Sequence, residues 1–226
     1  MIRRGRRAST PSMRQATIVR ARMIAPQVRE LTFDPGPGHH HVPGHWVTLF
    51  LDDSSGSPIK RQYSIASAQR ADGTFDLAVT RVVDGPMSTF LNEAPIGTRM
   101  RMLEAQGLFV LEPMVRPILF VGTGTGVAPY RAMLEELDAK ANAGPPIELL
   151  FGCRTEEDLL YRDELEALAK RWPRFSFHPT LSRAPESWQG RRGYVQTHLV
   201  ETLERLGKDC DVYVCGLTKM VKEVRR

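Results

Sequence analysis

A chain of 226 residues can hold one large domain or two of ordinary size, each able to bury its own core, and we expect two. With 42% hydrophobic and 25% charged residues, the composition is that of a globular protein, and no apolar run is long enough to cross a bilayer. No apolar stretch typical of a secretory signal follows the N-terminal arginines. We therefore expect a cytoplasmic protein without a membrane span.

The net charge of +5 is concentrated at the N-terminus. Five arginines before residue 15 have no acidic neighbour there, and without them the 31 basic residues would equal the 26 acidic ones. We interpret residues 1–14 as a solvated, disordered basic tail and expect no nucleic-acid partner. The basic residues of this tail are Arg3, Arg4, Arg6, Arg7 and Arg14.

The cysteines and histidines do not form a pattern of metal ligands. The three cysteines, Cys153, Cys210 and Cys215, form no CxxC pair, which excludes a disulfide framework, an iron–sulfur module and a zinc ribbon. Four histidines crowd into one Gly/Pro-rich loop without a nearby carboxylate or thiolate, so we predict a surface loop and no metal site. They are His39, His40, His41 and His45.

Two patterns of predicted secondary structure divide the chain. Residues 15–112 hold short strand-like runs broken by Gly, Pro and Asp, which is typical of a small antiparallel β-barrel. Over residues 117–226, apolar strands alternate with amphipathic helices, which predicts a doubly wound parallel sheet after a connector at 112–116. The predicted strands are 16–22, 28–33, 46–51, 74–81, 117–121, 147–151, 175–181 and 211–215, and the predicted helices are 129–140, 161–171 and 195–206.

A glycine-rich turn, Gly122-Thr-Gly-Thr-Gly-Val-Ala-Pro129, joins the predicted strand at 117–121 to the following helix. Glycines let backbone N–H groups approach a pyrophosphate, and the helix N-terminus adds partial positive charge. Pro129 suits the first helical turn, where its missing N–H costs nothing. Tight turns also use glycine for steric reasons, but the place between strand and helix favours a nucleotide site.

Two shorter motifs in the first half suit an anionic, aromatic ligand. In Arg61-Gln-Tyr-Ser64 the arginine offers donors to phosphate, the tyrosine a flat face, and the serine a hydroxyl for a ring nitrogen. The motif is expected where a strand leaves a loop, and alternation along a strand would split its side chains over two faces, so a solvent arginine, a core tyrosine and a polar strand end would fit the same residues. Gly85-Pro-Met-Ser88, before a predicted helix at 89–93, either delivers backbone donors at a helix start or simply holds a capping serine.

These three motifs and Val214-Cys-Gly216 followed by Met220 occur in the order and approximate spacing of the ferredoxin–NADP reductase superfamily, which the chain resembles from about Ala16 onward. That superfamily includes cytochrome b5 reductase and reductase components of oxygenases. The resemblance implies an FAD-dependent oxidoreductase, with an FAD-binding barrel and an NAD(P)-binding α/β domain.

The resemblance also implies the roles of individual residues. Tyr63 packs on the isoalloxazine, Ser64 hydrogen-bonds near flavin N5, and Arg61 holds the FAD diphosphate with the backbone of Met87 and Ser88. Ser64 and Cys215 are the implied catalytic residues. The other implied FAD contacts are Gln62, Ala78, Thr80 and Gly85. The implied contacts of the nicotinamide nucleotide are Thr123, Gly124, Thr125, Gly126, Val127, Ala128, Arg154, Ser182, Arg183, Arg191, Cys215, Gly216 and Met220.

The expected cosubstrate is NADP(H), with NAD(H) as the alternative. In the superfamily, a serine–arginine pair such as Ser182-Arg183 resembles a seat for the 2′-phosphate of NADP, whereas an acidic residue there would bind the ribose hydroxyls of NAD. Arg154 supports the same reading, and Arg191 and Arg192 would add positive charge. The segments around these residues also resemble NADH-using relatives.

The implied reaction moves a hydride between NADP(H) and FAD, and single electrons to or from ferredoxin, flavodoxin or another external carrier. The alternatives are a reductase component of an oxygenase or other multicomponent enzyme, a non-catalytic FAD-binding electron-transfer or regulatory subunit, and nucleic-acid binding through the arginine tail. Relatives continue beyond the helix that begins at Thr218, so we expect a second domain truncated at Arg226. The sequence does not indicate the oligomeric state.

Overall fold

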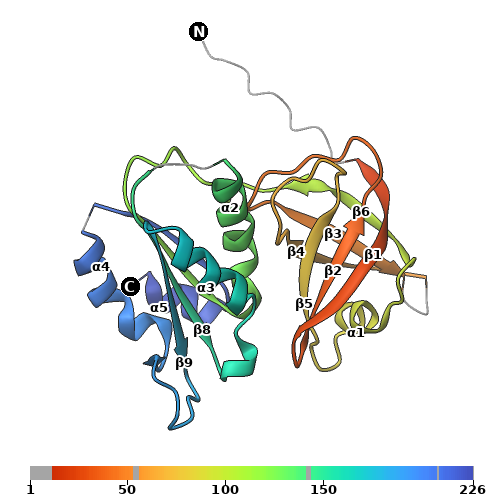
Figure 1. Cartoon of the computed structure of the whole chain (residues 1–226). Coiled ribbons are helices and arrows are strands. Elements are labelled where there is room, and N and C mark those ends of the chain that lie inside the picture. The colour runs from red at the N-terminus through yellow and green to blue at the C-terminus, as the bar shows by residue number, and fades with distance from the viewer. Residues whose placement is uncertain (1–11, 53–55, 141–143, 208, 226) are drawn as a thin grey trace.

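The computed structural model describes residues 12–52, 56–140, 144–207 and 209–225. An antiparallel sheet, built from residues 13–106, lies beside a parallel sheet, built from residues 118–215 (Figure 1). The segment 107–117 connects them. This arrangement confirms the predicted fold class.

Six antiparallel strands form the first sheet, in the order β4-β3-β6-β1-β2-β5. A bridge between Ile65 and Leu77 joins the two ends of that order, so the sheet closes into a barrel. Alternate residues point inward, and Leu31 and Phe33 are fully buried in the barrel core. The elements are β1 (Met13–Ala25), β2 (Val28–Asp34), β3 (Trp46–Asp52), β4 (Pro58–Ser64), β5 (Phe75–Thr80), α1 (Pro86–Glu93) and β6 (Arg99–Gln106).

Two parts of the barrel differ from the sequence-based prediction. Strand β6, with the sequence RMRMLEAQ, was not predicted, because it is rich in residues that favour helices. Of the mostly polar β4, only the strand end at residues 61–64 was expected. Met13 and Arg14 were assigned to the tail but begin β1, where Arg14 Nε donates to Glu104 at 2.6 Å. The rest of the predicted tail, residues 1–11, lies outside the described residues.

The predicted histidine-rich surface loop is wrong for two of its four histidines. His39 and His41 are 6% and 1% exposed and pack against the ring of Phe75 in the barrel. Nδ1 of His39 lies 3.1 Å from Glu104, and Nε2 of His41 lies 3.1 Å from the carbonyl oxygen of Ser67. The loop therefore uses these two histidines as buried packing residues, which the surrounding glycines and prolines concealed.

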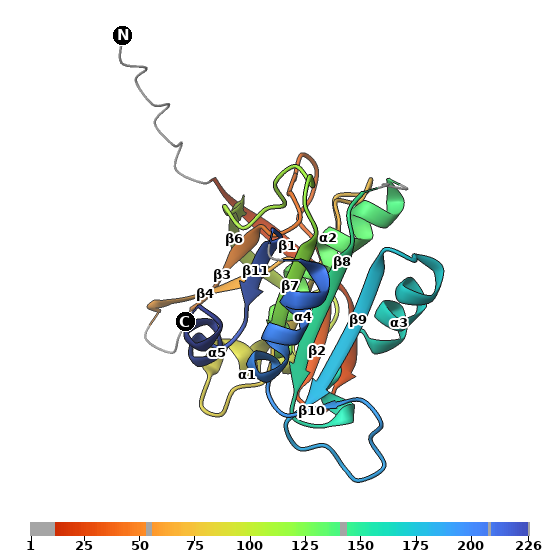
Figure 2. The same cartoon turned by 90° about the vertical axis from the view of Figure 1, so that its left-hand side faces the viewer.

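Five parallel strands form the second sheet, in the order β10-β9-β8-β7-β11. Helices α2 and α3 pack on the face that is turned to the barrel, and α4 and α5 pack on the opposite face (Figures 1 and 2). The strands are β7 (Ile118–Thr123), β8 (Ile147–Cys153), β9 (Phe175–Leu181), β10 (Arg191–Arg192) and β11 (Asp211–Cys215). The helices are α2 (Ala128–Ala139), α3 (Arg162–Arg171), α4 (Leu199–Leu206) and α5 (Thr218–Val224).

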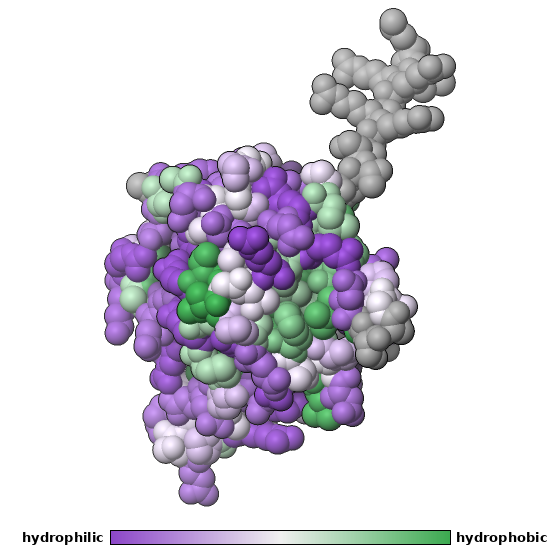
Figure 3. All heavy atoms as spheres, turned by 90° about the vertical axis from the view of Figure 1, so that its right-hand side faces the viewer, coloured by the Kyte–Doolittle hydropathy of each residue, from purple (hydrophilic) through white to green (hydrophobic). Residues whose placement is uncertain are grey.

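One hydrophobic cluster spans both sheets. It combines Val28, Ala66 and Ala78 of the barrel with residues of α2, α3 and the parallel sheet. The opposite side of the barrel, seen in Figure 3, is mostly polar with separate apolar areas. In the described parts of the chain, no helix has the length and hydrophobicity needed to cross a bilayer.

We expect His41 to make stability depend on pH. Burial lowers the pKa of His41 to about 4, below its ordinary value of 6.5. A neutral His41 therefore stabilises the fold above pH 6.5, and this contribution is lost as the pH falls from about 6.5 to about 4, by about 3 kcal/mol. Urea unfolding at pH 7 and pH 4 should show a smaller loss in His41→Leu than in the unmodified protein. The exposed neighbour provides the control, since His40→Leu should keep the full loss.

We expect Gly44→Ala to destabilise the junction between the loop, the connector and α2. A Cβ at Gly44 would lie 1.8 Å from the carbonyl oxygen of Phe109, and the φ of Gly44 is +98°. The free energy of unfolding should fall by more than about 2 kcal/mol. Gly36→Ala is the matched control, because its φ of +74° has no atom within 4 Å of the added Cβ, and it should cost only about 1 kcal/mol. Equal losses, measured by chemical denaturation, would contradict the steric argument.

Candidate functional site

The motif at residues 61–64 forms the second half of β4, with Tyr63 opposite Val47 and Ser64 opposite Trp46. Tyr63 packs against the barrel core but is only partly buried, and burial raises the pKa of its hydroxyl to about 12. One part of the ring is thus fixed by packing while another part stays accessible. Tyr63 can therefore be part of the barrel core and still offer its ring to a ligand.

Arg61 and Gln62 are exposed on the same strand. The Arg61 guanidinium donates to the carbonyl oxygen of Lys60 at 2.8 Å and has no acidic partner among the described residues. An exposed guanidinium without a carboxylate is available to an external anion such as a phosphate.

Ser88 is engaged within its own loop. Its hydroxyl donates to the carbonyl oxygen of Gly85 at 2.9 Å and accepts from the backbone N–H of Val82 at 3.1 Å. Gly85 is the N-cap of α1 and provides no side-chain cap, so Ser88 is not a simple capping serine. Met87 is buried in the barrel core, so only the backbone at the start of α1 remains for a ligand.

On β5, the side chain of Ala78 is buried in the cluster between the sheets, and the side chain of Thr80 is exposed. A cofactor contact at Ala78 would therefore have to use its backbone. Neither residue shows the sequence signal of a binding site on its own.

The glycine-rich turn follows β7 as a short 3-10 helix, Gly124–Val127, which leads directly into α2. A Cβ at Gly126 would lie 2.3 Å from the carbonyl oxygen of Cys215, so glycine is required where the turn meets the end of β11. The hydroxyl of Thr123 also accepts from the backbone N–H of Leu217 at 3.4 Å. The structure thus brings together two motifs that are about 90 residues apart.

Within this turn, Thr123 and Thr125 are partly exposed and Gly124 is exposed, whereas Gly126, Val127 and Ala128 are buried. The last three can contribute backbone only. At the end of β11, Gly216 is exposed and Cys215 is partly buried, and burial raises the pKa of the Cys215 thiol to about 11. Cys215 is therefore a neutral thiol at neutral pH and not a thiolate nucleophile.

Met220 does not lie on the accessible side of this region. It is 6% exposed and packs into the cluster behind the sheet with Leu119, Val121 and Leu150. Its predicted role as a cofactor contact is not supported, because a core position at the start of α5 has the same spacing from Cys215-Gly216 as a ligand contact.

The structure brings Arg154, Ser182 and Arg183 together at the carboxyl ends of β8 and β9. The backbone N–H of Arg183 donates to the carbonyl oxygen of Arg154 at 2.8 Å, and that of Ser182 donates to Cys153 at 3.0 Å. Both arginine side chains are exposed and form no ion pair within the described segments. They lie at the same edge of the parallel sheet as the glycine-rich turn, where such sheets bind ligands.

Arg191 and Arg192 were predicted to add positive charge for the nucleotide, but in the structure both guanidinium groups have partners within the protein. Arg191 pairs with Glu201 on α4 at 3.2 Å. The Arg192 guanidinium donates to four backbone carbonyl oxygens of the loop that follows Arg183, at 2.8–3.3 Å. Arg192 therefore holds the loop in place. These carbonyl groups belong to Ala184, Pro185, Glu186 and Trp188.

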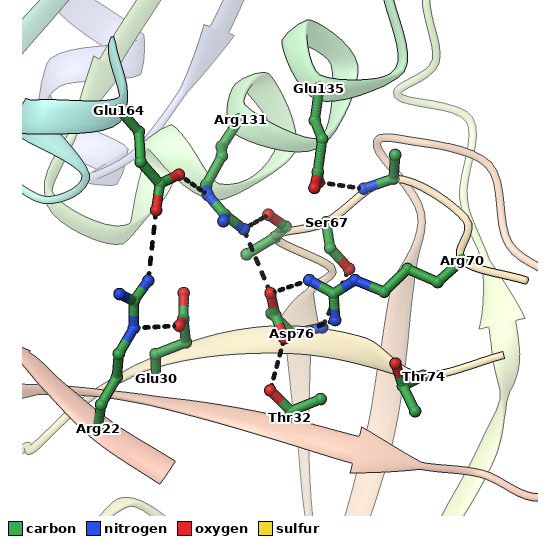
Figure 4. A network of polar contacts seen from close by, with 12 residues as sticks. Arg22, Glu30, Thr32, Ser67, Arg70, Thr74, Asp76, Arg131, Glu135 and Glu164 are labelled. Atoms are coloured by element: carbon green, nitrogen blue, oxygen red, sulfur yellow. Dashed lines mark hydrogen bonds and ion pairs between the residues drawn. The ribbon is translucent and has the colours of Figure 1, made fainter. Parts of the chain in front are cut away.

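A network of polar contacts that was not predicted from the sequence lies between the two domains (Figure 4). Arg131 and Glu135 of α2 bind backbone groups of residues 66 and 68, and Arg131 also pairs with Asp76 of β5 at 3.3 Å. The spacing of four between Arg131 and Glu135 was the available signal, since it places both on one face of a helix. The other members are Arg22, Glu30, Thr32, Arg70 and Glu164.

No group of three or more His, Cys, Asp or Glu side chains in the described ranges is arranged to hold a metal ion. A cavity of about 430 Å³ lies beside the charged network and includes Arg20, Arg70 and Arg131 in its lining. It is separate from the three sequence motifs.

Two family models match the chain. A model described as an oxidoreductase FAD-binding domain matches residues 15–110, and one described as an oxidoreductase NAD-binding domain matches residues 120–226. The structure is similar to the crystal structure of a ferredoxin NADP+ reductase from Neisseria gonorrhoeae with bound FAD and NADP, with a TM-score of 0.82 and 24% sequence identity. The superposition covers 94% of this chain and 89% of that chain. That likeness concerns the fold.

Two curated proteins have a higher sequence identity to this chain. The chain is 35% identical over 184 residues to the electron transfer component of toluate 1,2-dioxygenase from Pseudomonas putida, covering 81% of this chain and 53% of that protein. It is 45% identical over 219 residues to ferredoxin–NADP reductase B of Sorangium cellulosum, covering 93% of this chain and 89% of the relative. The chain therefore belongs to the ferredoxin–NADP reductase family of flavoprotein oxidoreductases.

Proposed function

We propose that this chain binds FAD on the barrel and NADP(H) on the parallel sheet, and that it exchanges a hydride between them and single electrons with an external carrier. The observation that carries the proposal is the presence, beside the motifs of both domains, of exposed arginines that have no acidic partner among the described residues. Arg61 is such a residue on β4, and Arg154 and Arg183 are such residues at the ends of β8 and β9.

The barrel residues fit FAD. Tyr63 offers a partly accessible ring held by the core, and Ser64 follows it on the strand. Arg61 offers the diphosphate an exposed guanidinium that forms no ion pair with a described residue. The backbone at Met87 and Ser88, at the start of α1, adds donors for an anion. The hydroxyl of Ser88 supports this site indirectly, because it holds the preceding loop.

The second domain fits NADP(H) better than NAD(H). The turn at 123–128 has exposed backbone at Gly124, and Arg154 and Arg183 provide two positive charges with Ser182 between the strands. A 2′-phosphate carries the negative charge that such a pair would bind. No acidic residue takes the place of Ser182, where it would bind ribose hydroxyls.

The protein's own residues act by binding and orientation, without a general acid–base pair. Bound FAD would supply the chemistry of accepting a hydride and releasing electrons singly. Tyr63 would pack on one face of the ring, and Ser64, the next residue on β4, would offer its hydroxyl as a hydrogen-bonding group. Cys215, as a neutral thiol at the end of β11, shapes the nicotinamide site. The proposed carrier is ferredoxin or flavodoxin, supported by the 45% identical relative that is named a ferredoxin–NADP reductase.

A second candidate is a reductase component of an oxygenase. It is supported by the 35% identity to the electron transfer component of toluate 1,2-dioxygenase, of which the chain spans about half. This candidate predicts a preference for NADH and stable co-purification with an oxygenase partner, whereas the first predicts a preference for NADPH.

An anaerobic titration tests the proposed function. Purified protein loaded with FAD should be yellow, and NADPH should bleach the flavin absorbance faster than NADH does, because the two arginines bind the extra phosphate. Addition of oxidised ferredoxin should then restore the yellow colour in one-electron steps. A protein that takes up no FAD, or a flavin that neither nucleotide reduces, would refute the proposal.

We expect Arg183→Ala and Arg154→Ala to weaken NADPH use selectively. The loss of one charge-assisted hydrogen bond, about 1.5–3 kcal/mol, should raise the KM for NADPH by about tenfold or more and leave the KM for NADH nearly unchanged. Steady-state kinetics with both nucleotides measure this. Arg116→Ala is the control, because Arg116 lies before β7, at the other end of the sheet, and pairs with Asp211 at 2.6 Å. If it changed NADPH use equally, the effect would be one of overall charge.

A further inference from the structure

Helix α2 connects the nucleotide turn of the second domain directly to the barrel. It begins at Ala128, where the glycine-rich turn ends, and its side facing the barrel carries Arg131 and Glu135. On the barrel side, these residues bind the segment 66–68, which begins two residues after Ser64. The contact therefore lies three residues from the proposed nicotinamide site and two residues from the proposed flavin site.

Two hydrogen bonds from side chain to backbone make this contact. Nη1 of Arg131 donates to the carbonyl oxygen of Ala66 at 2.6 Å, and Oε2 of Glu135 accepts from the backbone N–H of Ala68 at 2.8 Å. Residues four apart on a helix are separated by about 6 Å along the axis, and two residues of extended chain span up to about 7 Å. The spacing of the helix thus matches that of the chain it binds. We call this pair the α2 clamp.

The segment that the α2 clamp holds is itself fixed to the barrel. The backbone N–H of Ala66 donates to the carbonyl oxygen of Asp76 at 2.8 Å, and the Ser67 hydroxyl accepts from the N–H of Asp76 at 3.1 Å. The Asp76 carboxylate, in turn, accepts from Arg70 at 2.9 Å and from the hydroxyl of Thr32 at 2.7 Å (Figure 4). A displacement of α2 would therefore be transmitted to β5 and to the chain after β4.

The clamp is also fixed on the side of the second domain. Arg131 Nε donates to Glu164 of α3 at 2.7 Å, and its guanidinium lies 4.5 Å from the ring centroid of Tyr161. Burial alone would lower the pKa of Arg131, but its hydrogen bond and ion pair with Glu164, together with the electrostatic influence of Tyr161 and Glu135, raise the pKa overall. Arg131 is therefore charged at any ordinary pH.

We propose that Arg131 and Glu135 are positioning residues that set the distance between the flavin ring at Tyr63 and the nicotinamide at the glycine-rich turn. This inference rests on the proposed function. Hydride transfer requires the reacting atoms at about 3–3.5 Å, and a misplacement of about 1 Å can slow a reaction by about a hundredfold. A cavity of about 430 Å³ borders Arg131, so on that side of the clamp polar contacts, and not close packing, hold α2 to the barrel.

The decisive variant is Glu135→Met, which removes the acceptor for the Ala68 N–H and keeps a side chain of similar length. In the FAD-loaded protein, stopped-flow reduction of the flavin by NADPH should slow by about tenfold or more at saturation. The NADPH concentration for half-maximal rate, and the affinity for 2′,5′-ADP, should each change by less than about threefold. Hydrogen exchange of the Ala68 amide should become at least about tenfold faster, which reports on the clamp without any redox reaction.

Two other variants serve as matched controls. Glu135→Gln retains a carbonyl acceptor and should keep the flavin-reduction rate within about threefold of the unmodified protein. Lys140→Met removes an ion pair, 2.7 Å long, between the C-cap residue of α2 and Glu136, and should leave the rate unchanged. Arg131→Met should slow flavin reduction at least as much as Glu135→Met.

The outcomes separate this inference from the proposed function. If the unmodified protein is reduced by NADPH and Glu135→Met is reduced equally fast despite faster exchange at Ala68, the positioning role is wrong and the reductase function stands. If the affinity for 2′,5′-ADP falls as much as the rate, the clamp supports the fold of the nucleotide site and does not set the distance. If neither nucleotide reduces the unmodified protein, both the function and the inference fail.

Discussion

The packing of helix α2 against the barrel is the constraint on which the two-domain arrangement depends. One face of α2 must cover the parallel sheet through residues such as Met133 and Leu137. The adjacent residues of the same helix must meet the barrel at Ala66 and Ala78. A single helix thus belongs to two surfaces, and its N-terminus also ends the glycine-rich turn. Because the barrel contacts at this helix combine apolar packing with buried charge, the relative orientation of the domains is specific as well as stable.

The arginines of this protein fall into two groups with different roles. Arg131 and Arg192 are committed to internal acceptors, and each one holds a backbone segment in place. Arg61, Arg154 and Arg183 are exposed at the edges of the two sheets, and the part of the chain that the structure describes provides no acidic partner for them. This contrast supports the assignment of anion binding to the second group, since side chains that already satisfy internal carbonyl groups or carboxylates have little to offer a ligand.

Much of this organisation could be predicted from the sequence, because the signals are local. Apolar periodicity located four strands of the parallel sheet but not the polar, two-residue β10, and the turn at 122–129 was recognised between strand and helix. The sequence could not reveal that His39 and His41 are buried, or that Met220 and Arg191 serve the core and an ion pair, because burial depends on distant segments. The α2 clamp was missed for the same reason: its acceptors are backbone groups, which every residue possesses.

The hydrogen bonds by which Arg192 holds the loop after Arg183 affect how the nucleotide preference could change. Its four carbonyl contacts keep the loop after Arg183 ordered without any ligand, so binding does not have to include the entropy of arranging that loop. Because this loop is preformed, the residues that hold its backbone differ from the residues that select the nucleotide. Residues 154, 182 and 183 can therefore be exchanged while the backbone beneath them is retained. Evolution or design could therefore switch the preferred dinucleotide through a few side-chain replacements rather than by remodelling the loop.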